Sequence, residues 1–227
     1  MDIRLPLLRS EKDLTELVRE LGFLPFFQNE ISGFSIEDCT PPDRWFSPDN
    51  DGPWEWKGPV AQTKTCIYGK LFGKKAGFVS REWMPRFCNY RRDGYDFEAR
   101  WEDQLVPYQD KRVYDRIRER TAIETGFLKS DLNFRKGGNK GFDTIITRLQ
   151  MQTYVIIGDF VYHRDKHFRP YGWGVSLYTT PEAVFGCDEV NAACDEAPEE
   201  SRDAMLAHLK RILPRTEEKK LLRLLRG

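Results

Sequence analysis

Carboxylate side chains gather in two places where their neighbours could adapt them to acid–base chemistry. The segment RRDGYDFEARWED contains five acids, Asp96 among them, and Glu55 stands between two tryptophans in PWEWKG. A carboxyl group in apolar surroundings has a raised pKa, which is what a general acid requires. Glu55 and Asp96 are therefore catalytic candidates. The alternative is a solvated or ion-paired loop, because closeness in sequence does not make side chains converge in space.

The cysteines and histidines do not form a familiar metal or disulfide pattern. The five cysteines are odd in number, widely spaced and without a C-x-x-C pair, which predicts reduced thiols. His163 and His167 followed by Cys187 and Cys194 do not match a zinc spacing. We expect no metal and no cofactor.

Basic residues are unevenly distributed, although the formal net charge is zero. Residues 64–100, 110–180 and 201–227 each have an excess of Lys and Arg, whereas residues 181–200 hold seven acids and no base. An electrostatic field depends on this distribution rather than on the total charge. Two or three basic surfaces joined by an acidic connector are compatible with a nucleic-acid partner.

Residues 110–180 give the clearest local pattern. A helix after Asp110 is followed by a turn at Thr125-Gly126, a short second helix in KSDLNF, and a third helix in FDTIITRLQMQ with apolar residues at helical spacing. The runs YVIIGDFVY and YGWGVSLY flank the polar HRDKHFRP, which predicts a β-hairpin with a charged tip. Three helices and a hairpin are the order of a winged helix.

In a DNA-binding winged helix, the third helix enters the major groove and the wing follows the backbone or the minor groove. The residues predicted to contact DNA are the outward positions of this helix, the cations before it and the charges of the wing. These are Lys136, Lys140, Thr144, Thr147, Arg148, Arg164, Lys166, His167 and Arg169. A second basic patch is predicted at Lys74, Lys75, Arg91 and Arg92. In the alternative interpretation, the third helix serves packing or protein contacts.

The remaining elements predict an α+β fold. We expect a first helix at 11–21, an irregular segment with short helices at 23–58, and a hairpin at 65–72 and 76–79, for which a helix through the first half is the alternative. Ser80 should cap a helix that includes Pro85 in its first turn, and 93–103 should be a loop and a short turn. Two basic amphipathic helices should follow, separated at Pro214. We therefore divide the chain into an N-terminal α+β region (1–108), a winged-helix domain (109–185), and an acidic connector with C-terminal helices (186–227).

Two segments resemble the AlkZ/YcaQ family of DNA crosslink glycosylases, which are built from tandem winged-helix domains. KKAGFVSREWMPRF is similar to that family's H-E-A-S-F-x-P-x-E-x-W-P segment. The stretch from IRERTAIETGFLKS through RKGGNKGFDTIITRLQ to VSLYTTPEAVF is similar to its second winged helix. Together these segments cover about half of the chain.

The resemblance departs from the family at the catalytic element. That family's chemistry is associated with a Gln-hydrophobe-Gln or Gln-hydrophobe-Asp element in its first winged helix. Gln150-Met151-Gln152 has these residue types but falls in the third helix of the second module, and Gln152 is a catalytic candidate on this resemblance alone. The N-terminal region should be too short for a complete first winged helix.

Three hypotheses for function follow. The first is a winged-helix protein that binds double-stranded DNA and recognises damaged DNA, the second is a DNA N-glycosylase, and the third is a protein-interaction scaffold without DNA binding. Dimerisation stays open. No apolar run is long enough for a membrane span, and charge near the N-terminus argues against a signal peptide. We therefore expect a cytoplasmic protein without a membrane partner.

Overall fold

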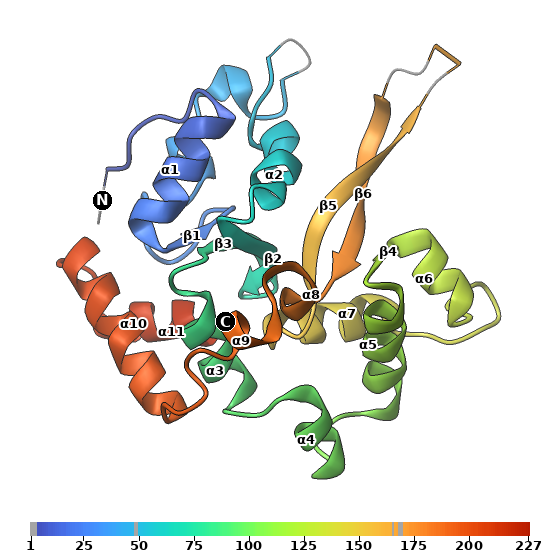
Figure 1. Ribbon diagram of the computed structural model, residues 1–227. Coiled ribbons are helices and arrows are strands. Elements are labelled where there is room, and N and C mark those ends of the chain that lie inside the picture. Colours follow the sequence, from blue (N-terminus) through green and yellow to red (C-terminus); the bar gives the residue numbers. More distant parts are fainter. Residues whose placement is uncertain (1–3, 48–49, 165, 168–169) are drawn as a thin grey trace.

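A computed structural model describes residues 4–47, 50–164, 166–167 and 170–227. Helices surround two three-stranded antiparallel sheets, which confirms the predicted α+β class (Figure 1). The buried apolar side chains form one continuous cluster that runs through the chain from Leu8 to Leu225.

The first half begins with α1 (Glu11–Leu21), as predicted. The Ser10 side chain accepts a hydrogen bond from the backbone N–H of Asp13, and the apolar face of the helix is buried. Gly22 ends the helix with φ 77°, a conformation that favours glycine. The chain continues through β1 (Phe23–Pro25), the short 3₁₀ turns η1 (Glu37–Cys39) and η2 (Pro42–Arg44), and α2 (Pro53–Gln62).

The predicted hairpin of the first half is confirmed as β2 (Cys66–Phe72) and β3 (Lys75–Ser80). The sheet order is β1-β3-β2, so β3 lies in the centre. Close packing there requires a glycine, because a Cβ on Gly77 would lie 2.4 Å from the Phe72 ring and 2.9 Å from the carbonyl oxygen of Leu24.

The second half contains the predicted three helices and hairpin, plus a short strand. The elements are α5 (Tyr108–Arg120), β4 (Ala122–Glu124), α6 (Thr125–Asp131), α7 (Phe142–Met151), β5 (Ile156–Arg164) and β6 (Pro170–Thr179). The sheet order is β4-β6-β5. The elements of this half therefore follow the same order as those of the first half, in which η1 and η2 take the place of α6. The amino-acid sequence shows no such repeat, and the first half contains more of this arrangement than its length led us to expect.

The two halves pack into each other around their hairpins. Strands β2 and β5 are in contact, α7 packs on β2, and α2 packs on β5. The side chain of Gln150 in α7 is fully buried and accepts a hydrogen bond of 2.9 Å from the backbone N–H of Lys70 in β2. Each half therefore places the helix before its hairpin against the hairpin of the other half.

The segments outside the two sheets join the halves further. Helices α3 (Met84–Arg92) and α4 (Phe97–Glu102) connect them, and α8 (Pro181–Phe185), α9 (Cys187–Val190), α10 (Pro198–Ile212) and α11 (Glu218–Arg226) follow. Helix α10 packs on α3, and α11 contacts α10 and β2.

Two predictions in the linking region were wrong. Ser80 belongs to β3, and Trp83 is the residue before α3, with Pro85 in the first turn as expected. The segment 93–103 contains the helix α4 where a loop and a short turn were predicted. The Asp96 carboxylate caps this helix by accepting a hydrogen bond of 2.8 Å from the N–H of Ala99.

All five cysteines are free, which confirms the prediction of reduced thiols. Among the described residues, no cluster of three or more His, Cys, Asp or Glu side chains could hold a metal ion. Nor does any helix in the described part of the chain have the length and apolar character to cross a membrane.

Candidate nucleic-acid interface

The loop before α7 and the first turn of this helix form an exposed basic surface. Lys136 and Lys140 are exposed on a loop that contains three glycines, and Thr144 is exposed in the first turn of α7. Within the described residues, neither lysine has an acidic partner. The carboxylate of Asp143, in the first turn of α7, lies 3.5 Å from the ammonium group of Lys129. This surface can therefore offer two free ammonium groups to an anion.

The second half of α7 is engaged within the protein. Thr147 accepts a hydrogen bond of 3.1 Å from the Lys70 ammonium group. Arg148 forms two bonds of 2.6 Å to the carboxylate of Asp110, whose side chain is almost fully buried. This contact raises the pKa of Arg148, so the guanidinium stays charged and held in place. Of the predicted DNA contacts on α7, Thr144 is the exposed one, while Thr147 and Arg148 have internal partners.

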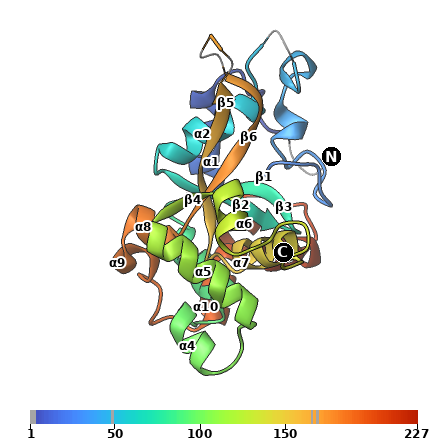
Figure 2. The ribbon, with the colours of Figure 1, turned by 90° about the vertical axis from the view of Figure 1, so that its right-hand side faces the viewer.

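The predicted wing extends away from the packed base of its hairpin. In both views, β5 and β6 reach well beyond the helices of the second half (Figures 1 and 2). Lys166 and His167 are exposed at its tip. The side chain of Arg164 and the whole of Arg169 lie outside the described residues. The base of the hairpin packs on α2 and β2, so the wing is anchored to the other half of the protein.

The predicted second basic patch separates into an exposed part and a buried part. Lys74, in the turn between β2 and β3, and Lys75, the first residue of β3, are exposed. Arg91 donates to the carbonyl oxygens of Leu71 and Met151, at 2.5 and 3.0 Å.

Arg92, in contrast, is only 4% exposed. It donates to the Glu182 carboxylate at 2.7 Å and to the Thr153 carbonyl at 2.8 Å. Its prediction as a surface residue was wrong, because its partners are more than 60 residues away in the sequence and their approach depends on the tertiary fold.

The three catalytic candidates do not form a common site. Glu55 is exposed and accepts a hydrogen bond of 2.9 Å from the backbone N–H of Gly52, so it helps to cap α2. Asp96 caps α4, and Gln152 follows the last residue of α7. Helices α2 and α4 lie at opposite ends of the molecule in both views (Figures 1 and 2). Glu55 therefore lacks the enclosed surroundings that its two tryptophan neighbours suggested.

The acidic connector binds the basic residues that follow β3. Glu189 lies 2.6 Å from Arg81, and Glu196 lies 2.7 Å from Arg86. These hydrogen bonds lower the pKa of both carboxyl groups. Together with the contact between Glu182 of α8 and Arg92, they show that the acidic segment 181–200 uses several of its charges inside the protein.

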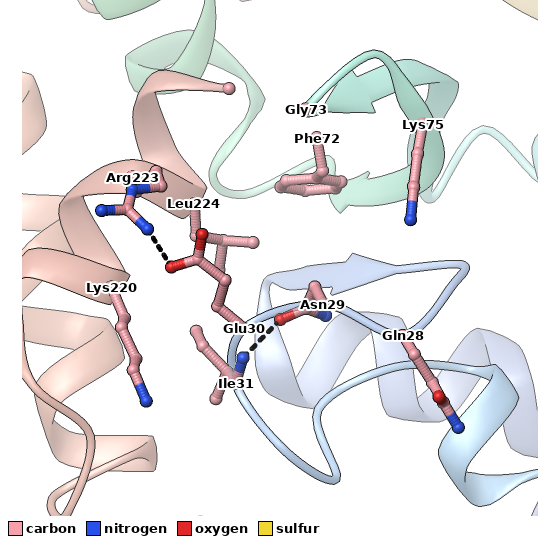
Figure 3. Close-up of a pocket in the computed structure, with 11 residues that line it drawn as sticks. Gln28, Asn29, Glu30, Ile31, Phe72, Gly73, Lys75, Lys220, Arg223 and Leu224 are labelled. Atoms are coloured by element: carbon pink, nitrogen blue, oxygen red, sulfur yellow. Dashed lines mark hydrogen bonds and ion pairs between the residues drawn. The ribbon is translucent and has the colours of Figure 1, made fainter.

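A pocket between the N-terminal loops and the C-terminal helix was not predicted from the sequence. It has a volume of about 290 Å³ and lies between the segment after β1, the turn between β2 and β3, and α11 (Figure 3). Lys75 is the first residue of β3, and Lys220 and Arg223 come from α11. The two α11 residues are three positions apart and therefore share a helix face, which the sequence alone indicates. The loop and strand residues that face them could be identified only from the fold.

The comparisons with known proteins identify a family. A family model described as AlkZ related matches residues 8–226, almost the whole chain. Neither the curated proteins nor the solved structures contain a match. The resemblance seen in the two sequence segments is thereby confirmed.

Proposed function

Because the chain belongs to the AlkZ-related family, we propose that it is a winged-helix protein that binds double-stranded DNA and recognises damaged DNA. The family's relation to DNA-repair glycosylases supports DNA as the partner. The winged-helix module of this proposal is residues 109–185. Its support is the order of elements from α5 to β6, with the short strand β4 paired to the second strand of the hairpin.

The surface at the start of α7 carries the proposal. Lys136 and Lys140 are free of acidic partners within the described chain, and Thr144 is exposed in the first turn of the helix that follows them. Phosphate oxygens are bound mainly by Lys, Arg, hydroxyl and backbone N–H groups. These residues, together with the hairpin tip around Lys166, could bind the backbone of one duplex.

The internal contacts of α7 limit how it would read DNA. Thr147 and Arg148 are bound to Lys70 and Asp110, so only the first turn of the helix is free to approach base edges. The proposed complex therefore depends mostly on phosphate contacts, which bring strong salt dependence and little sequence selectivity.

Charge reversal at Lys136 and Lys140 is the first test. We expect the double variant to lose at least about tenfold in affinity for a labelled duplex at low salt, measured by fluorescence anisotropy. The slope of log affinity against log salt should become shallower by about 2, because two phosphate contacts are lost. A second variant, with Glu at Arg164, Lys166 and Arg169, should weaken binding in the same way.

Lys12→Glu with Arg19→Glu, on the exposed face of α1, provides the matched control. Equal losses in this control and in the Lys136 and Lys140 variant would show that only net charge matters, and the proposed interface would be wrong. Comparing plain with methylated duplex in the same titration tests the recognition of damage.

A DNA N-glycosylase is the second proposal, and membership of the AlkZ-related family is the observation that favours it. An enzyme would produce alkali-labile sites in the methylated duplex alone, whereas a sensor would bind without producing them. If cleavage persists in a variant lacking the side chains of Glu55, Asp96 and Gln152, none of these three residues is catalytic.

A further inference from the structure

One face of α7 reaches solvent over more than its first turn. Thr144, Thr147 and Arg148 stand three or four positions apart and therefore share this face. Thr144 is exposed, and Thr147 and Arg148 are half-buried. The positions that alternate with them, such as Ile145 and Leu149, are buried in the core. The surface that begins at Thr144 therefore continues to Arg148, one helical turn further along.

The guanidinium group of Arg148 binds Asp110 through one of its edges. Its Nε and Nη2 atoms donate to the two oxygens of the carboxylate, each at 2.6 Å. The third nitrogen, Nη1, forms no hydrogen bond with the described residues. A guanidinium group carries five N–H donors in a fixed planar fork, and two of them belong to Nη1. Arg148 therefore keeps two donors that Asp110 does not use.

The two members of this ion pair differ in their exposure. The side chain of Asp110 is 2% exposed, because α5 packs on α7, whereas that of Arg148 is 39% exposed. The guanidinium group thus lies between the carboxylate and solvent. An anion that arrives from solvent meets the cation first and stays further from the carboxylate. Since Coulomb energy falls with distance, attraction by Arg148 exceeds repulsion by Asp110.

Two further cations lie along the same helix. Lys140 precedes α7, and Lys70 reaches the helix from β2, where its ammonium group donates a hydrogen bond of 3.1 Å to Thr147. A hydroxyl group leaves the charge of Lys70 uncompensated. No acidic side chain within the described part of the chain is bonded to Lys70 or Lys140. Arg148 therefore stands beside a surface that attracts anions.

We propose that Asp110 is a positioning residue for DNA binding, which holds the guanidinium group of Arg148 so that its Nη1 donors bind a phosphate of the duplex. This inference rests on the proposed DNA-binding function and adds a phosphate contact to it, while base edges remain within reach of the first turn of α7 alone. A mobile arginine loses side-chain freedom when it binds a phosphate. Arg148 has already lost much of this freedom in the contact with Asp110, so binding costs less.

Asp110→Asn separates positioning from charge. The substitution nearly preserves the shape of the side chain and removes one negative charge, so charge alone would tighten binding to a polyanion. We expect the opposite, a loss of about fivefold in affinity for a labelled duplex at low salt, because Arg148 is no longer held. Fluorescence anisotropy measures this affinity.

Glu189→Gln is the matched control for the lost charge. Glu189 accepts hydrogen bonds from Nε and Nη2 of Arg81, so this pair has the same edge-on geometry, but neither residue belongs to α5 or α7. The control variant should bind the duplex at least as tightly as the wild type does.

A double-mutant cycle tests whether Asp110 acts through Arg148. Arg148→Gln should weaken binding about tenfold, and the slope of log affinity against log salt should become shallower by about 1. Asp110→Asn in the Arg148→Gln background should cause no further loss. Arg148→Lys keeps the charge but not the planar fork, so it should recover little of the lost affinity. Urea denaturation checks that each variant is folded.

The outcomes separate this inference from the DNA-binding function. Unchanged or tighter binding by Asp110→Asn, or an equal loss in the Arg148→Gln background, overturns the role of Asp110 and leaves the DNA-binding function intact. If Asp110→Asn does not fold, Arg148→Lys decides: affinity equal to that of the wild type overturns the inference, and a loss like that of Arg148→Gln supports it. Absence of duplex binding by the wild type overturns the DNA-binding function and this inference together.

Discussion

Lys57 is a basic side chain enclosed by aromatic rings. It is 5% exposed, its ammonium group lies 4.8 and 4.5 Å from the ring centres of Trp54 and Phe160, and it donates a bond of 2.6 Å to the Trp54 carbonyl. Burial lowers its pKa from 10.5 to about 8. Cation–π contacts therefore compensate only part of the lost hydration.

This burial predicts that the stability contributed by Lys57 rises at alkaline pH. Between pH 8 and 10.5 the folded state has released the proton while the unfolded state still holds it, so the free energy of unfolding increases with pH. The full shift corresponds to about 3 kcal/mol. The difference in unfolding free energy between wild type and Lys57→Met, measured by urea denaturation from pH 7 to 10, should grow in favour of the wild type.

Lys64→Met serves as the control, because Lys64 is exposed just after the same helix. Its difference from the wild type should stay constant over this pH range. A constant difference for Lys57→Met as well would show that Lys57 keeps an ordinary pKa.

Helix α7 joins the two halves at the level of elements. Its buried Gln150 bonds the Lys70 N–H and the Ile146 carbonyl, and its close approach to β2 is possible because a glycine stands there. A Cβ on Gly69 would lie 3.1 Å from the Gln150 oxygen. β2 is an edge strand of its sheet, and the Gln150 side chain provides the acceptor for the Lys70 N–H that a neighbouring strand would otherwise provide.

Gln150→Ala should destabilise the protein by about 2 kcal/mol or more, because the Lys70 N–H loses its acceptor and a cavity remains. Gln152→Ala, two residues later, is the matched control, because the Gln152 side chain is half-buried and has no hydrogen bond to the described residues. This substitution should lower the free energy of unfolding by less than about 0.5 kcal/mol. Urea denaturation followed by circular dichroism measures both. Equal costs would contradict the structural role of Gln150.

The amphipathic pattern of α7 predicted the helix but not its surroundings. Apolar spacing identifies which positions are buried, and Phe142, Ile145 and Leu149 are buried as expected. It does not identify the partners of polar positions, so the bond of Arg148 to Asp110 and the burial of Arg92 were missed. Those contacts join residues 38 and 90 positions apart. The helix α1 was predicted with its capping residue, because Ser10 directly precedes the helix in the sequence.

The two halves of the molecule are held together because each packs a helix on the hairpin of the other. Because α2 packs on β5 and α7 packs on β2, unfolding of either half would uncover part of the hairpin of the other half. The buried apolar cluster includes residues of both sheets and of the C-terminal helices. Separation would expose apolar surface on each side, at a cost that grows with the area uncovered.

This arrangement predicts one cooperative unfolding transition, with no stable intermediate in which a single half is folded. Far-ultraviolet circular dichroism follows the helices of both halves, and tryptophan fluorescence is weighted toward the first, where Trp45, Trp54 and Trp56 lie. The two urea curves should have one midpoint, and Gln150→Ala should lower both midpoints equally, since the interface belongs to both halves. If the fluorescence midpoint moved apart from that of circular dichroism in this variant, the halves would be separate folding units joined by a weak contact.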